Sequence, residues 1–85
     1  MPLVRVFTTR VCPYCHAAKE LLKKKGAAFE EIDVTDDPEA RSHLREKTGR
    51  TTVPQIYIGQ LHVGGFDDLR ALDQAGKLDP LLAGP

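Results

Sequence analysis

Two cysteines separated by two residues are the most reactive feature of this sequence. They lie in the segment Cys12-Pro13-Tyr14-Cys15 and are the only two cysteines of the chain. A helix that begins here brings both sulfurs together on its first turn, close enough to form a disulfide. The free N–H groups and the dipole at a helix N-terminus favour a thiolate, which is the nucleophile in disulfide exchange. The spacing therefore predicts thiol–disulfide chemistry in which Cys12 attacks and Cys15, one turn deeper, resolves.

Three other interpretations of the cysteines fit less well. The segment from Cys12 to His16 satisfies the pattern of c-type haem attachment, but Met1 is the only methionine that could serve as a second axial ligand. A structural zinc site needs four ligands, whereas the three histidines lie on separate predicted elements, and His43 and His62 are interpreted as solvated surface residues. Inert core cysteines would not need a capping position beside proline and tyrosine. We therefore expect a redox pair and no metal.

Hydrophobic periodicity and turn residues predict the elements that position this pair. In chain order they are a strand at 3–8, a helix from Cys12 to Gly26, a strand at 28–34, a helix from Asp37 to Gly49, a hairpin of strands at 54–58 and 61–63, a helix from Asp67 to Gly76, and a short tail at 78–82 that packs back. The order βαβ-α-ββ-α predicts a single α/β domain over residues 1–85. Its mixed four-stranded sheet would carry helices on both faces.

Composition and charge exclude several classes of partner. Twelve basic residues balance twelve acidic ones, so the chain lacks the positive surface of a nucleic-acid binder or a polybasic membrane anchor. No apolar stretch approaches the ~20 residues that span a bilayer, and the first residues lack the apolar core of a signal peptide. We therefore expect a cytoplasmic monomer with no nucleic-acid or membrane partner. In that reducing compartment a cysteine pair is rarely a structural disulfide.

Two downstream segments are candidates for binding a substrate. Pro54 lacks an N–H and is expected at a strand start, which leaves the backbone of Val53 available to pair with an extended, cysteine-containing substrate. The segment 64–68 (Gly-Gly-Phe-Asp-Asp) offers helix N–H groups to an anion, and Asp67 could pair with an ammonium group. The plainer alternatives are a strand boundary and a turn followed by a helix cap. A ligand carrying both a carboxylate and an ammonium group describes the γ-glutamyl end of glutathione.

Three motifs at this spacing together resemble the glutaredoxin family. They are Cys12-Pro13-Tyr14-Cys15-His16, the stretch 49–56 (Gly-Arg-Thr-Thr-Val-Pro-Gln-Ile), and Gly64-Gly65-x-Asp67-Asp68-Leu69. The resemblance runs through essentially the whole chain and is greatest to the dithiol Cys-Pro-Tyr-Cys class, in particular the short bacterial glutaredoxin 3 type. It implies the thioredoxin fold, with Pro54 in a cis peptide.

The resemblance also implies an activity and a binding site. The activity is glutathione-dependent reduction of glutathione mixed disulfides and protein disulfides, with glutathione as cosubstrate and no tightly bound cofactor. The implied partners are glutathionylated proteins and disulfide-containing enzymes such as ribonucleotide reductase, with glutathione reductase acting indirectly. The implied glutathione contacts are Tyr14, Thr52, Val53, Pro54, Gly65, Phe66, Asp67 and Asp68.

One position departs from the family pattern. Family members often have a lysine three residues before the first cysteine, where it contacts the glycyl carboxylate of glutathione. In this chain the position is Thr9, and Arg10 and Arg50 are the candidates to replace the lysine. Pro13 argues against an iron–sulfur cluster, because members that carry clusters usually lack this proline.

Overall fold

A parallel β–α–β unit opens the chain in the computed structural model, which describes residues 2–84. Strand β1 (Val4–Thr8) alternates buried and half-buried residues, as its sequence pattern predicts. Helix α1 (Pro13–Lys24) begins directly after Cys12, with proline at its first position, where a missing N–H costs no hydrogen bond. Strand β2 (Glu30–Asp33) then returns to pair with β1 in parallel.

An antiparallel hairpin in the second half completes the sheet. Helix α2 (Pro38–Thr48) leads into strand β3 (Gln55–Ile58), which turns back as strand β4 (Leu61–Gly64). The strand order is β2-β1-β3-β4, and β3 is antiparallel to both β1 and β4. Helices α3 (Phe66–Gln74) and α4 (Leu78–Ala83) follow. The predicted mixed four-stranded sheet is therefore confirmed.

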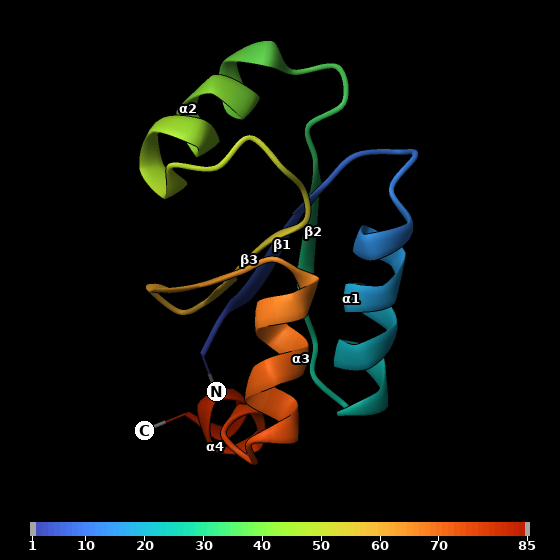
Figure 1. Ribbon diagram of the computed structural model, residues 1–85, viewed down its shortest axis with the longest axis vertical. Coiled ribbons are helices and arrows are strands. Elements are labelled where there is room, and N and C mark those ends of the chain that lie inside the picture. The colour runs from blue at the N-terminus through green and yellow to red at the C-terminus, as the bar shows by residue number, and fades with distance from the viewer. Residues whose placement is uncertain (1, 85) are drawn as a thin grey trace.

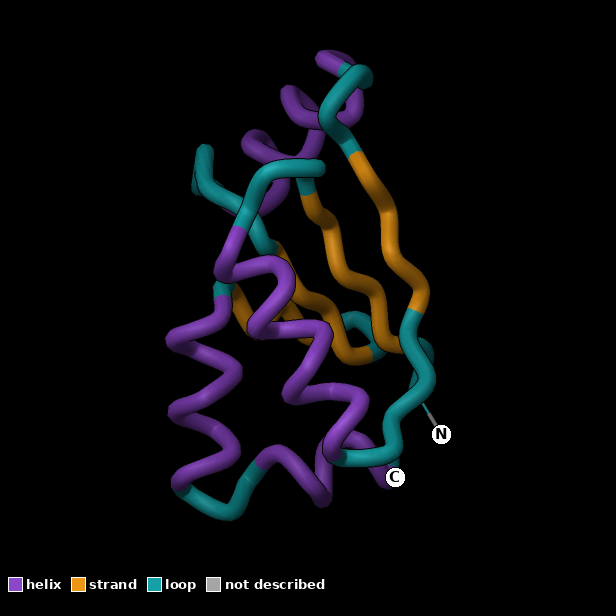
Figure 2. The backbone as a smooth tube through the Cα atoms, turned by 90° about the vertical axis from the view of Figure 1, so that its right-hand side faces the viewer, coloured by secondary structure: helices purple, strands orange, loops and turns teal. Residues whose placement is uncertain are grey.

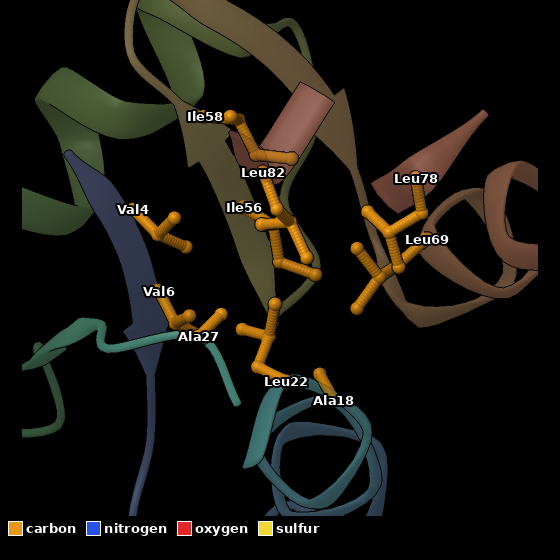
Figure 3. Packing of buried hydrophobic residues seen from close by; sticks show 10 residues of the cluster. All are labelled: Val4, Val6, Ala18, Leu22, Ala27, Ile56, Ile58, Leu69, Leu78 and Leu82. Carbon is orange, nitrogen blue, oxygen red and sulfur yellow. The ribbon is translucent and has the colours of Figure 1, made fainter. Parts of the chain in front are cut away.

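The helices divide between the two faces of the sheet (Figures 1 and 2). Helices α1, α3 and α4 lie on one side, where the hydrophobic core forms, while α2 lies apart at one end. Tyr57 of β3 points to the α2 side, and the ammonium group of Lys47 lies 5.0 Å from the centre of its ring. Figure 3 shows the core side chains pointing toward one another. The cluster consists of Val4, Val6, Ala18, Leu22, Ala27, Ile56, Ile58, Leu69, Leu78 and Leu82.

Most observed boundaries lie within one or two residues of the predicted ones, and three differences have a clear structural reason. Strand β2 is shorter than 28–34, because its only partner is the short strand β1. Helix α3 begins at Phe66 rather than at Asp67, because Gly65 is its N-cap. The predicted tail is the helix α4, whose i, i+4 spacing puts Leu78 and Leu82 on one buried face. Within residues 2–84 no helix has the length and the apolar run needed to cross a bilayer.

Removing the side chain that anchors α4 should destabilise the whole fold. Leu78 is fully buried in the core cluster, so Leu78→Ala is expected to lower the free energy of unfolding by about 2–4 kcal/mol. Leu3 is 56% exposed, and Leu3→Ala should cost less than about 1 kcal/mol. Urea unfolding followed by circular dichroism measures both values. Equal losses in the two variants would contradict a core role for α4.

Candidate active site

The sulfur of Cys12 caps the N-terminus of helix α1. The backbone of Cys12 is extended (φ −153°, ψ 97°), and its Sγ accepts a hydrogen bond from the Cys15 backbone N–H at 3.2 Å. On its other side the thiol donates to the Val53 carbonyl oxygen at 3.6 Å. The first turn of this fully described helix contains no acidic residue, so the positive end of its dipole is not neutralised there. The sulfur therefore sits where negative charge is stabilised.

Cys15 lies one turn into α1 and has the opposite environment. It is 2% exposed, whereas Cys12 is only half-buried. Burial raises the pKa of the Cys15 thiol to about 12, and its hydrogen bond with the Cys12 sulfur acts in the same direction. Opposing this, the Thr9 backbone N–H and the charge of Lys19 lower the pKa, but by less. In the reduced protein Cys15 is a shielded, protonated thiol beside a more accessible one.

A groove of about 240 Å³ opens beside Cys12, between the N-termini of α1 and α3 and the loop that precedes β3. Its lining residues are Tyr14, Arg50, Thr52, Val53, Pro54, Gly65, Phe66, Asp67 and Asp68. The structure thus brings together every residue that the family resemblance implies for glutathione, and it adds Arg50. The aromatic rings of Tyr14 and Phe66 lie 6.4 Å apart, centre to centre. Three segments far apart in the sequence form this one surface.

A buried glutamine holds the loop between α2 and β3. Gln55 is fully buried; its Nε2 donates to the Thr52 carbonyl oxygen at 2.9 Å, and its Oε1 lies 2.7 Å from His62 Nε2. Because a backbone carbonyl can only accept, the amide orientation is fixed, and His62 must carry its proton on Nε2. Burial lowers the pKa of His62, and the charge of Arg50 adds to that effect. The interpretation of His62 as a solvated residue is therefore wrong.

The sequence analysis missed Gln55, although the sequence held one signal for it. That signal is a polar residue, Gln55, in an otherwise apolar strand. In the structure His62 pairs with Tyr57, two residues further along β3. The peptide between Val53 and Pro54 is cis, as the resemblance implies. No residue within 2–84 accepts a hydrogen bond from the Val53 N–H. That backbone donor at the wall of the groove therefore remains free.

An ion pair joins the two sides of the groove at one end. Arg50 Nη1 donates to Asp68 Oδ2 at 2.8 Å, and the same oxygen accepts from the Gly65 backbone N–H at 3.0 Å. Both hydrogen bonds lower the pKa of Asp68, the one from Arg50 more strongly. Gly64 makes room for the pair, because a Cβ there would collide with the Asp68 carboxylate. Asp67, by contrast, forms no ion pair with any residue from 2 to 84.

Arg10 lies outside this groove. Its guanidinium pairs with Asp36, and its backbone N–H donates to the Thr35 hydroxyl at 2.9 Å. Thr9 and Arg10 line a separate hollow together with Arg41. Of the two arginines that the sequence offers in place of the family lysine, the structure brings only Arg50 to the groove.

The arrangement of a capped sulfur, a shielded partner thiol and an adjoining groove suits disulfide exchange. Residues 4–63 match the family model described as Glutaredoxin. Over 83 residues the chain is 58% identical to the Glutaredoxin of Pseudomonas aeruginosa. The aligned residues cover 98% of this chain and 99% of that protein. The chain belongs to the glutaredoxin family. It is a thiol–disulfide oxidoreductase.

Other relatives agree in sequence and in fold. The chain is 50% identical to Glutaredoxin 3 of Escherichia coli over 82 residues, which is 96% of this chain and 99% of that one. A buckwheat glutaredoxin–glutathione complex superposes with a TM-score of 0.90 at 32% identity, over 96% of this chain and 77% of the other. The solution structure of Brucella melitensis glutaredoxin superposes with a TM-score of 0.88 at 55% identity. That match covers 96% of this chain and 89% of the other. The predicted thioredoxin fold and glutaredoxin family are confirmed.

The different environments of the two sulfurs predict selective alkylation. At pH 8 iodoacetamide should modify Cys12 in the reduced, folded protein, while Cys15 reacts about a hundredfold or more slowly because its thiol is buried and protonated. Peptide mapping by mass spectrometry after a timed quench measures both rates. In guanidinium chloride the two rates should converge. Rapid double modification of the native protein would contradict the assigned environments.

Proposed function

We propose that this chain uses glutathione to reduce glutathione mixed disulfides and protein disulfides through Cys12 and Cys15. The observation that carries the proposal is the groove beside the Cys12 sulfur, which is lined by the eight residues that the family resemblance implies for glutathione. A buckwheat glutaredoxin of the same fold forms a complex with glutathione. No tightly bound cofactor is needed, because thiol–disulfide exchange passes electrons directly between sulfurs. No cluster of His, Cys, Asp or Glu side chains within residues 2–84 is arranged to hold a metal ion.

Each part of the groove offers a partner for one part of glutathione. Gly65 has no side chain to cap α3, so the N–H groups of the first turn are available to the γ-glutamyl carboxylate. The unpaired carboxylate of Asp67 suits the γ-glutamyl ammonium group. The free N–H of Val53 suits the backbone of the cysteinyl residue, which would pair as a short strand. This orientation presents the glutathione sulfur to Cys12, because the Val53 carbonyl contacts Cys12 Sγ.

Deglutathionylation requires only one of the two cysteines. The Cys12 thiolate attacks the glutathione sulfur of the mixed disulfide, and the repaired protein leaves as a thiolate that takes up a proton. A second glutathione thiolate then attacks the glutathione sulfur on Cys12, so that glutathione disulfide leaves and the Cys12 thiolate returns. The helix N-terminus stabilises the Cys12 thiolate both as nucleophile and as leaving group.

Reduction of a protein disulfide requires both cysteines. Cys12 first forms a mixed disulfide with the target, and Cys15 then attacks the Cys12 sulfur and releases the reduced target. The Cys12–Cys15 disulfide is returned to the dithiol by two glutathione molecules. The proposed targets are glutathionylated proteins and disulfide-containing enzymes such as ribonucleotide reductase, and glutathione reductase regenerates the glutathione. The reducing cytoplasm fits this chemistry, and a monomer is sufficient because one chain supplies the whole groove.

Arg41 is the residue that we propose for the glycyl carboxylate of glutathione, in place of the missing lysine at Thr9. Arg10 and Arg50 are already paired with Asp36 and Asp68, respectively. Arg41 forms no ion pair within residues 2–84, and it lines two hollows. One contains Val53 and the other contains Thr9, so Arg41 lies between the groove and the position of the lysine.

Serine variants should separate the two reactions. In an assay coupled to glutathione reductase and NADPH, Cys15→Ser is expected to retain reduction of a glutathionylated peptide and to lose nearly all reduction of a protein disulfide. Cys12→Ser should lose both, because the attacking sulfur is gone. Equal loss of both activities in Cys15→Ser would contradict the division of roles. Absence of glutathione turnover in the folded wild type would contradict the proposal itself.

Removal of the Arg41 charge should weaken the use of glutathione. Arg41→Gln is expected to raise the KM for a glutathionylated peptide roughly two- to fivefold with a smaller change in kcat, since an exposed ion pair contributes up to about 1 kcal/mol. Arg70→Gln is the matched control, because Arg70 is an exposed arginine of α3 outside the groove lining. A KM that is the same in both variants would assign the glycyl carboxylate to another group.

A further inference from the structure

A network of polar side chains lies behind Cys15, and neither of the proposed reactions uses it. Lys19 Nζ lies 3.0 Å from Glu31 Oε2, and the Thr8 hydroxyl donates to the same oxygen at 2.9 Å. Lys19 is on α1, Thr8 ends β1, and Glu31 is on β2. The network therefore ties the middle of α1 to the neighbouring strands β1 and β2.

The position of Lys19 relative to Cys15 is set by the helix. Lys19 follows Cys15 by four residues, and side chains so spaced lie on the same helix face with Cβ atoms about 5–6 Å apart. The Lys19 side chain is only 24% exposed, whereas that of Lys23, one turn later, is 63% exposed. The ion pair with Glu31 holds the ammonium group against the sheet instead of letting it extend into solvent. A fixed positive charge therefore lies on the face of α1 that carries the buried sulfur.

The resolving step creates a need for such a charge. Cys15 must become a thiolate before it can attack, yet it is buried, and burial disfavours the charged form. The cap position that stabilises a thiolate is taken by Cys12, which accepts the Cys15 N–H. The Thr9 backbone N–H and the Lys19 charge are the two groups that favour a Cys15 thiolate. Thr9 directly follows Thr8, so the same network also borders that N–H group.

We propose that Lys19, held in place by Glu31 and Thr8, stabilises the Cys15 thiolate during resolution of the mixed disulfide. In this step Cys15 gives its proton to a base in solvent, and its sulfur attacks Cys12 Sγ. The Cys12–Cys15 bond forms as the bond to the target sulfur breaks, and the target thiolate leaves and takes up a proton. Two electrons pass from the dithiol to the target. Lys19 is a positioning residue that acts through Cys15, and the inference rests on the proposed roles of the two cysteines.

The other charged groups near this network do not cancel the effect. Cys12 and Lys19 are the ionisable groups that act on Cys15, while α3 contributes apolar side chains such as Leu69 to the core. Glu31 is ionised at neutral pH, because the hydrogen bond from Lys19 lowers its pKa, while partial burial and, more weakly, the nearby Asp33 oppose this shift. Glu31 therefore fixes the position of Lys19, whose charge favours the Cys15 thiolate.

The aromatic disulfide 5,5′-dithiobis(2-nitrobenzoate) separates attack from resolution in the full-length protein. Attack by Cys12 releases a first coloured thiolate, and attack by Cys15 on the resulting mixed disulfide releases a second. Lys19→Met should lower the ratio of the second rate to the first about three- to tenfold at pH 7.5, as expected for loss of one charge at this separation. The pH midpoint of the second release should rise by about half a unit to one unit. Lys19→Arg should restore most of the ratio.

Two further variants distinguish charge from structural support. Lys23→Met removes an exposed lysine of the same helix and should leave the ratio unchanged. Glu31→Gln removes the negative charge but keeps the ammonium group of Lys19 and an amide oxygen that can still accept its hydrogen bond, so the ratio should stay much closer to the wild type than in Lys19→Met. A Glu31→Gln variant that resolves as slowly as Lys19→Met, or a Lys19→Met variant with an unchanged ratio and pH midpoint, would overturn the inference.

The test does not depend on glutathione. If the wild type shows both releases and Lys19→Met changes their ratio, the inference holds even where glutathione turnover fails. If glutathione turnover succeeds and the ratio is unchanged, only the inference fails. The double variant Cys15→Ser/Lys19→Met gives the remaining check. Without Cys15 there is no second release, and Lys19 has no thiol to act on. The deglutathionylation rate of the double variant should therefore equal that of Cys15→Ser alone.

Discussion

The hydrogen bond from the Cys15 backbone N–H to the Cys12 sulfur both caps helix α1 and fixes the position of the nucleophile. Helix N-caps are usually oxygen acceptors, which satisfy one of the free N–H groups of the first turn. Here a sulfur takes that place, and Pro13 fixes the backbone angle at the next position. The groove, the shielded second thiol and the loop at Val53 matter chemically because they surround a sulfur whose position α1 already determines.

Two cysteines one turn apart therefore differ because of geometry rather than residue type. Cys12 has the free end of the helix and the groove beside it, while Cys15 has the core behind it. Burial raises the pKa of Cys15 and so favours its protonated thiol in the reduced protein. This difference is useful, because a dithiol whose second sulfur ionised readily would expose two competing nucleophiles to the same target. The cost of burial is that resolution needs help from the groups around Cys15.

Local sequence rules predicted most of the fold and half of the site. The cap at Cys12 follows from residue order within one turn, so it could be deduced without knowledge of the tertiary structure. The groove brings Tyr14, Thr52 and Gly65 together from three segments. The residues alone indicated the segment that contains Gly65, whereas only the family resemblance named Tyr14 and Thr52 in advance. The pairing of Gln55 with His62 and of Lys19 with Glu31 depends on which strand faces which helix. No periodicity contains that information, and so His62 was misinterpreted and Lys19 was not singled out.

The two sides of the groove are held by polar anchors that a ligand does not need to break. Gln55 fixes the Thr52 carbonyl from inside the sheet, and Asp68 fixes the start of α3 by binding Arg50 and the Gly65 N–H together. Adjacent carboxylates therefore differ in role, since Asp68 Oδ2 accepts from both Arg50 and the Gly65 N–H, while Asp67 is left for a ligand. A surface that is already ordered loses little conformational entropy on binding. In a chain of 85 residues with a modest core, such anchors allow an accessible sulfur and a rigid groove to coexist.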